Sequence, residues 1–293
     1  TIAGEPDAVC EAAFRVIKSA YENIDMRNHS GEHPRIGAVD VCPFIPLEGV
    51  TMSECAEMSE ILAKRVSSEL ELCTFLYGAA ASSPERELLS DLRKGQYEGF
   101  EERLNNQGPN LPDYGPTVWN EKTAKFGAVV IGARQILVAY NVNVDEKDAN
   151  AARKAGSLVR STGRLLKKED GRRTRIPGML PMVQGMGLPL ESHGISQVSM
   201  NLRDVTITPM HIAFEAVKSI VNDHGVNTCG SELVGLIPLS AMLDSGRWYA
   251  DEGCTDEHEL VNAAINGLGL DHLAPFDAED RIIEWALAKE VEV

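Results

Sequence analysis

Apolar residues recur at helical spacing in several parts of the chain. In residues 6–27, Val9, Ala13 and Ile17 lie four residues apart, so their side chains share one face of a helix, and Pro6 suits its first turn. This pattern predicts an amphipathic helix that packs against a core. We expect further helices at residues 54–70, 83–106, 146–163, 209–225, 239–250, 256–266 and 279–288.

Short runs that are rich in β-branched and aromatic residues separate the expected helices and predict strands. Residues 133–144 form such a run, and Asn141 and Asn143 alternate with apolar residues at its end. Residues 179–190 and 194–207 flank a short connection as the two arms of a hairpin. Other strands are expected at residues 38–46, 73–77 and 226–238.

The order of these elements indicates the fold class. From residue 133 onward the expected order is β-α-β-β-α-β, which is that of a ferredoxin-like unit. The first half has the order helix-strand-helix-strand, and residues 107–127 contain Pro109, Pro112 and Pro116 and should be mostly loop. With 293 residues, the chain has room for one large or two modest domains. We therefore expect an α/β (α+β) protein.

The charge of the chain limits its partners. Lys and Arg number 28 and Asp and Glu number 44, which gives a net charge of −16 at pH 7. Nucleic acids and anionic membranes both require a basic surface, so we expect neither as a partner. The apolar runs are a few residues long, far below the ~20 residues of a membrane span. Because aromatic residues make up only 5%, the core must consist mainly of aliphatic side chains.

The cysteines indicate the compartment. The six cysteines show no C-x-x-C motif and no paired spacing, which in a chain of this length is typical of reduced thiols. We therefore expect a cytoplasmic protein whose cysteines serve as small buried hydrophobic residues.

His29 and His33 stand four residues apart in the sequence HSGEHP. On a helix this spacing would place both imidazoles on one face, as a metal site requires, but Gly31 and Pro34 disfavour a helix here. We therefore expect no metal. An imidazole ordinarily has a pKa near neutrality, so His33 is of the residue type that suits a general acid or base. A surface or hydrogen-bonded histidine without a catalytic role is the alternative that the residues alone leave open.

A basic stretch at residues 164–175 (RLLKKEDGRRTR) contrasts with the acidic chain. The plain interpretation is a solvated loop between a helix and a strand. The alternative is a docking site for the polyanionic tail of a small molecule, because grouped cations focus the electric field locally. No interleaved aromatic residues accompany the cations, so nucleic acid fits poorly. The cations are Arg164, Lys167, Lys168, Arg172, Arg173 and Arg175.

Residues 115–128 (GPTVWNEKTAKFGA) combine Gly and Pro with Trp119, which we expect to be exposed. Such a loop is either a plain connection or, as in many two-domain enzymes, part of a site for a planar ligand. The chain contains no G-x-S-x-G, no P-loop and no G-x-G-x-x-G sequence. Nucleotide cofactors therefore have no support in the sequence.

Several longer motifs resemble those of the glutamate formimidoyltransferases in order and approximate spacing. The resemblance extends over residues 1–285. The motifs are HPRIGAVDVCPFIP (33–46), FLYGAA (75–80), DYGP followed by GAVVIGAR (113–134), LVAYNVNV (137–144), QVSMNL (197–202), SELVGLIP (231–238) and PFDAEDRIIEW (275–285).

The resemblance implies a transferase of one-carbon and histidine metabolism. It would move the formimidoyl group from N-formimidoyl-L-glutamate to N5 of tetrahydrofolate, which is a co-substrate, without a metal. The H-P-R-x-G motif places the catalytic histidine at His33, and Asp40 is the nearby carboxylate expected to orient it. The implied folate-binding residues are Gly115, Pro116, Thr117, Val118, Trp119, Lys125, Phe126 and Gly127.

The resemblance also implies two ferredoxin-like α/β subdomains, residues 1–135 and 136–293, whose sheets face across a substrate tunnel, and a homodimer is a further expectation. The family's opening strand–helix–strand segment has no counterpart before Thr1, so we expect the first sheet to lack its opening strands. The chain ends where the transferase part of bifunctional members would end, so we expect a single activity. A folate-binding protein without transferase activity, or a relative that transfers a formyl group from N-formylglutamate, remains an alternative.

Overall fold

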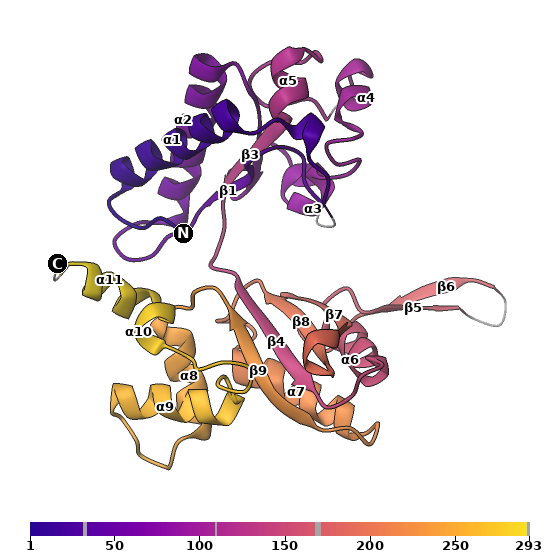
Figure 1. Cartoon of the computed structure of the whole chain (residues 1–293), viewed down its shortest axis with the longest axis vertical. Coiled ribbons are helices and arrows are strands. Elements are labelled where there is room, and N and C mark those ends of the chain that lie inside the picture. Colours follow the sequence, from indigo (N-terminus) through magenta and orange to yellow (C-terminus); the bar gives the residue numbers. More distant parts are fainter. Residues whose placement is uncertain (32–33, 109, 168–170, 292–293) are drawn as a thin grey trace. The chain divides into compact units, whose positions relative to one another are not determined.

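The computed structural model describes residues 1–31, 34–108, 110–167 and 171–291. The chain divides into two compact units, unit 1 (Thr1–Gln135) and unit 2 (Ile136–Val293), and each is described by itself (Figure 1). Both units pack helices against a sheet, which confirms the predicted α/β class.

The described strands of unit 1 form a three-stranded parallel sheet in the order β1-β3-β2. The central strand is fully buried, and its sequence AVVIGA is the continuous apolar run that is typical of a strand covered on both faces. The strands are β1 (Asp40–Phe44), β2 (Cys73–Gly78) and β3 (Ala128–Ala133). This parallel sheet differs from the antiparallel sheet of a ferredoxin-like unit.

Helices cover both faces of this sheet. The side chains of Val129 and Ile131 pack with α1 (Pro6–Asn23) and α2 (Met52–Leu70), while Val130 on the opposite face packs with Phe75 and the short helices. Thr51 begins α2 with a reciprocal capping box to Glu54. The helices that follow β2 are η2 (Pro84–Arg86), α3 (Leu89–Leu92), α4 (Phe100–Asn105) and α5 (Glu121–Phe126), and η1 (Met26–Asn28) follows α1.

Two expectations for unit 1 are wrong. Residues 83–106 form short helices instead of one long helix, because Gly95 and Gln96 have left-handed backbone conformations that no helix continues through. Residues 133–144 are not one strand: Ala133 ends β3, and the next strand begins only at Val138. The second strand belongs to unit 2.

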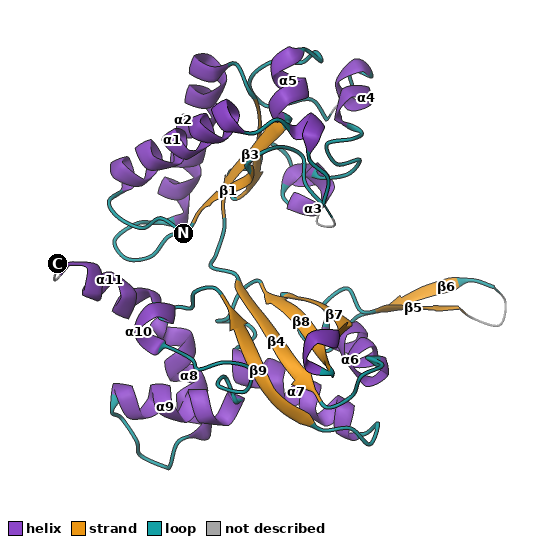
Figure 2. Cartoon of the chain, viewed as in Figure 1, coloured by secondary structure: helices purple, strands orange, loops and turns teal. Residues whose placement is uncertain are grey.

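Unit 2 contains a four-stranded antiparallel sheet in the order β7-β8-β4-β9 (Figure 2). This is the strand order of a ferredoxin-like unit, so the β-α-β-β-α-β prediction for the second half is confirmed. Val142 and Tyr140 of β4 are fully buried in the core with the two helices. The elements are β4 (Val138–Val144), α6 (Asn150–Val159), β7 (Val183–Leu190), β8 (Ile195–Leu202), α7 (Met210–Asn222) and β9 (Thr228–Val234), with η3 (Glu191–His193) between β7 and β8.

The basic stretch is a β-hairpin and not a loop. Strands β5 (Arg164–Lys167) and β6 (Arg173–Ile176) pair antiparallel, and the hairpin projects from unit 2 in Figure 1. The chain continues after β9 with α8 (Leu239–Tyr249), α9 (Glu257–Leu268), α10 (Ala278–Arg281) and α11 (Ile283–Val291). Across the part of the chain that the structure describes, no helix has both the length and the apolar character to cross a membrane.

Candidate functional site in unit 1

The segment that follows His33 packs against the end of the predicted folate loop. Two backbone hydrogen bonds, 2.9 and 3.2 Å long, join residues 36–38 to residues 126–128. Gly37 and Gly127 lie opposite each other in this contact. The structure therefore brings the end of the H-P-R-I-G motif to the end of the loop, although His33 itself lies outside the described residues.

Only glycine fits at the two positions where these segments meet. A Cβ atom on Gly37 would lie 2.1 Å from the carbonyl oxygen of Ala128. Gly127 has a φ of +78°, and a Cβ there would lie 2.2 Å from the carbonyl oxygen of Ile36. The backbones approach each other this closely because neither residue has a side chain.

Asp40 anchors the motif from its C-terminal side. Its backbone is left-handed, with a φ of 62°, a conformation that aspartate adopts more readily than most residues. Its carboxylate accepts a hydrogen bond from the backbone N–H of Ile36 at 2.9 Å and forms an ion pair with Arg93. These are its partners among the described residues, so an orienting role toward His33 stays a prediction.

Arg35, inside the motif, is largely buried and forms a bidentate pair with Glu98 at 2.7 and 3.0 Å. The same guanidinium donates to the backbone oxygen of His29 at 3.1 Å. The hydrogen bonds that Arg35 donates to Glu98 raise the pKa of Arg35 and lower the pKa of Glu98. Both groups therefore stay charged, and the pair holds the motif in place from a second side.

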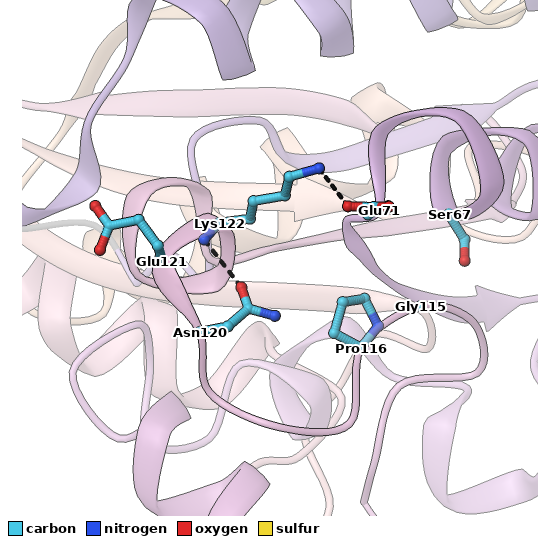
Figure 3. Close-up of a pocket in the computed structure, with 7 residues that line it drawn as sticks. All are labelled: Ser67, Glu71, Gly115, Pro116, Asn120, Glu121 and Lys122. Carbon is cyan, nitrogen blue, oxygen red and sulfur yellow. Dashed lines mark hydrogen bonds and ion pairs between the residues drawn. The ribbon is translucent and has the colours of Figure 1, made fainter.

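The predicted folate loop begins beside an open depression of roughly 480 Å³ (Figure 3). Gly115 turns the chain here with a φ of +95°. Lys122, at the start of α5, forms an ion pair with Glu71, and this hydrogen bond lowers the pKa of Glu71 and raises the pKa of Lys122. The lining residues are Ser67, Glu71, Gly115, Pro116, Asn120, Glu121 and Lys122.

Three of the predicted folate-binding side chains pack within unit 1. Trp119 is half-buried and contacts the ring of Phe100, with 6.1 Å between the ring centroids, so the expectation of an exposed indole is wrong. Phe126 is fully buried in the core. The ammonium of Lys125 lies 4.9 Å from the centre of the Tyr21 ring. The side chains of Thr117 and Val118, in contrast, are exposed.

Potential metal ligands are scattered in the described part of the chain. No group of three or more His, Cys, Asp or Glu residues there has the geometry to hold a metal ion. His33 lies outside this set, and the expected absence of a catalytic metal therefore stays a prediction.

A polar cluster in unit 2 had no assigned role from the sequence. Asn141 and Asn143 of β4, Gln197 of β8 and Glu232 of β9 are joined by side-chain hydrogen bonds, and His272 contacts Asn143. In the sequence, the alternation of polar and apolar residues in YNVNV, QVSMN and SELV indicates that each strand has one polar face. It could not show that the three strands are neighbours.

Two family models match the chain along nearly its whole length. The N-terminal subdomain of the formiminotransferase domain matches residues 1–134, and the formiminotransferase domain matches residues 139–288. Together with the two α/β units, these matches define a protein of the two-subdomain transferase class. The chain belongs to the formiminotransferase domain family, a family of transferase enzymes.

Relatives of two kinds share this similarity. The formimidoyltransferase-cyclodeaminase of Rattus norvegicus is 40% identical over 97% of this chain, which covers 51% of the relative, so the chain spans about half the length of that protein. The glutamate formimidoyltransferase of Streptococcus pyogenes serotype M1 is 38% identical over 89% of this chain and 81% of the relative. That of Thermoplasma acidophilum is 37% identical over 87% and 80%.

Proposed function

We propose that this protein transfers the formimidoyl group from N-formimidoyl-L-glutamate to N5 of tetrahydrofolate, in histidine degradation. The products are 5-formimidoyltetrahydrofolate and glutamate. The similarity to two glutamate formimidoyltransferases at 37–38% identity carries this proposal. The contact between residues 36–38 and 126–128 supports it, because it joins the proposed catalytic motif to the proposed folate loop.

We assign the proton transfers of the reaction to His33. N5 of tetrahydrofolate attacks the amidine carbon of the donor and forms a tetrahedral intermediate. N5 must lose a proton, and the departing amine of glutamate must gain one. One imidazole near neutrality can take the first proton and supply the second. Holding both substrates in register would supply much of the acceleration, so this scheme requires no covalent intermediate.

The folate loop would act through two groups of residues. The first group would contact the folate. It contains Thr117 and Val118, whose side chains are exposed, and Gly115 and Pro116, which line the open depression. It also contains Gly127, which lies at the contact with the motif. The packed side chains of Trp119, Lys125 and Phe126 would fix the shape of the loop instead.

We further propose a cytoplasmic location and a homodimer. All six cysteines are free thiols, which supports a reducing compartment. Light scattering on the purified protein, coupled to size-exclusion chromatography, should give the mass of two chains.

A transfer assay tests the proposed activity. Purified protein is mixed with tetrahydrofolate and either N-formimidoylglutamate or N-formylglutamate, and the folate product is followed by absorbance. We expect product with the formimidoyl donor and little with the formyl donor. Transfer from the formyl donor alone would contradict the proposed substrate. Binding of tetrahydrofolate without transfer from either donor would indicate a non-catalytic folate-binding protein.

A further inference from the structure

The segment between α3 and α4, residues 93–99, contacts both the H-P-R-I-G motif and the folate loop, and we call it the bridging segment. Toward the motif it forms two ion pairs, Arg93 with Asp40 and Glu98 with Arg35. The side chains of Arg93 and Asp40 are both largely buried. These pairs hold the bridging segment against the motif at two points.

Tyr97, within the bridging segment, spans the distance from the motif to the folate loop. Its backbone N–H donates to the carbonyl oxygen of Arg35 at 2.9 Å, and its hydroxyl donates to the carbonyl oxygen of Ala124 at 2.5 Å. Its ring also lies beside the indole of Trp119, with 6.2 Å between the ring centroids. Burial raises the pKa of the Tyr97 hydroxyl, so this group keeps its proton and remains a donor.

The bond from the Tyr97 hydroxyl replaces one that helix α5 loses at its end. In a continuing helix, the N–H of Ala128 would donate to the carbonyl of Ala124, four residues earlier. Here the N–H of Ala128 donates to the carbonyl oxygen of Ile36 in the motif at 3.2 Å. The carbonyl of Ala124 therefore needs a donor from outside the helix, and Tyr97 supplies it. The contact between motif and loop and the bond from Tyr97 thus depend on each other.

We infer that Tyr97 is a positioning residue that fixes the folate loop relative to the catalytic motif. The inference rests on the proposed function, in which the motif carries the proton-transferring group and the loop contacts the folate. A displacement of about 1 Å between reacting groups can slow a reaction on the order of 100-fold. One aromatic side chain that is hydrogen-bonded to the motif at its backbone and to the loop at its hydroxyl limits such a displacement.

The start of the folate loop has an anchor of its own. The thiol of Cys73 donates to the carbonyl oxygen of Pro116 at 3.1 Å. Loss of the Tyr97 hydroxyl should therefore leave the folate contacts that we propose for residues 115–118 in place. The inference thus predicts an effect on the transfer step and little effect on folate binding.

Tyr97→Phe removes the hydroxyl and keeps the ring and the backbone N–H. It should lower kcat by about tenfold and leave the KM for tetrahydrofolate within about threefold. Tyr249→Phe is the matched control, because Tyr249 is a half-buried tyrosine of α8 whose hydroxyl donates to Glu215 at 3.1 Å. A purely structural role would lower the melting temperature and leave kcat per folded molecule unchanged. That result, or the same fall of kcat in the control, would overturn the inference.

Hydrogen exchange, read by mass spectrometry without substrates, separates this inference from the proposed activity. In Tyr97→Phe, exchange should rise by about three- to tenfold, as for the loss of one hydrogen bond, in peptides from both residues 34–44 and residues 115–128. The control should exchange as the wild type does. If the wild type transfers no group and both peptides respond, the positioning contact stands and the proposed activity fails. A rise confined to residues 115–128 would make Tyr97 a local cap of α5 and overturn the inference, as would no rise.

Glu98→Ala tests the same coupling from the motif side if Tyr97→Phe does not fold. The substitution breaks the ion pair with Arg35, and the side chain of Glu98 is exposed, so core packing is kept. Exchange should again rise in both peptides, because the bridging segment connects the motif to the loop. A rise limited to residues 34–44, or no rise, would show that the bridging segment does not couple them.

Discussion

Single residues set the backbone path through the proposed catalytic motif. Asp40 is left-handed, and its carboxylate receives the N–H of Ile36 and the guanidinium of Arg93. Arg35 is fixed in turn by Glu98. The motif is thus held by two ion pairs, of which Arg93–Asp40 is largely buried on both sides, so that loss of either partner would leave a costly unpaired charge. In the second pair only Arg35 is largely buried, and Glu98 is exposed.

His33→Ala should lower kcat by roughly 10²–10⁴-fold and change the affinity for folate little, because a general acid/base acts on the transfer step and not on folate binding. Steady-state kinetics with formimidoylglutamate and tetrahydrofolate measure both quantities. His29→Ala is the control, since His29 is exposed and lies in the same segment. A near-normal kcat for His33→Ala would show that another group moves the protons.

Gly37→Ala should destabilise the protein by about 1–3 kcal/mol and lower kcat, because its Cβ would lie 2.1 Å from the carbonyl oxygen of Ala128 and would push the motif away from the folate loop. Urea unfolding and the transfer assay measure the two effects. Gly31→Ala is the control, since no heavy atom lies within 4 Å of its added Cβ. If both variants unfold at the same urea concentration, the close contact does not hold the motif.

At the scale of elements, the β5–β6 hairpin combines exposure with positive charge. The side chains of β6 are exposed along its whole length, including Arg173 and Arg175. Leu165, Leu166 and Ile176 of the hairpin are also exposed. The structure therefore replaces the expected loop with a paired element that presents Lys167, Arg173 and Arg175 to solvent, whereas Arg164 is half-buried. Lys168, in the connection between the strands, lies outside the described residues.

Reversing the charge of this hairpin should weaken a preference for polyglutamylated folate. Each glutamate of the tail adds one negative charge, and several exposed cations together could lower its KM by about tenfold at low salt. The KM is compared for mono- and pentaglutamyl tetrahydrofolate, at two salt concentrations, in the wild type and in Arg172→Glu/Arg173→Glu. Arg15→Glu/Lys18→Glu, at exposed positions of α1, is the control for net charge.

Two results would leave this hairpin as an ordinary solvated element. One is a wild type with no preference for the longer tail. The other is a preference that persists after both charge reversal and added salt, because an interaction between exposed charges should be screened.

For the whole molecule, we expect full activity without a bound metal. The proposed proton transfers need only an imidazole, and the described residues contain no group of three or more metal-ligating side chains with suitable geometry. Metal analysis of the active protein, before and after treatment with a chelator, checks this expectation. Stoichiometric zinc whose removal abolishes activity, and whose return restores it, would contradict the metal-free scheme.

The sequence by itself determined most of the long helices, most of the strands and the family. The amphipathic period of residues 6–27 and 209–225 matched α1 and α7 closely, because a helix depends on residues three and four positions apart. The strand order of unit 2 could be predicted because few sheet topologies are compatible with the succession β-α-β-β-α-β. The expected family rested on motifs such as HPRIGAVDVCPFIP, and the matches to the family models confirm it.

Only the tertiary structure decided which distant residues meet. The contact between Gly37 and Gly127, the burial of Trp119 against Phe100, and the central position of β3 each join segments that no local period relates. The polar cluster of unit 2, formed by Asn141, Asn143, Gln197 and Glu232, likewise depends on the registers of three strands, and a shift of one residue would move its side chains to the other face. Contacts of this kind are set by strand pairing and packing, which a pattern of neighbouring residues does not encode.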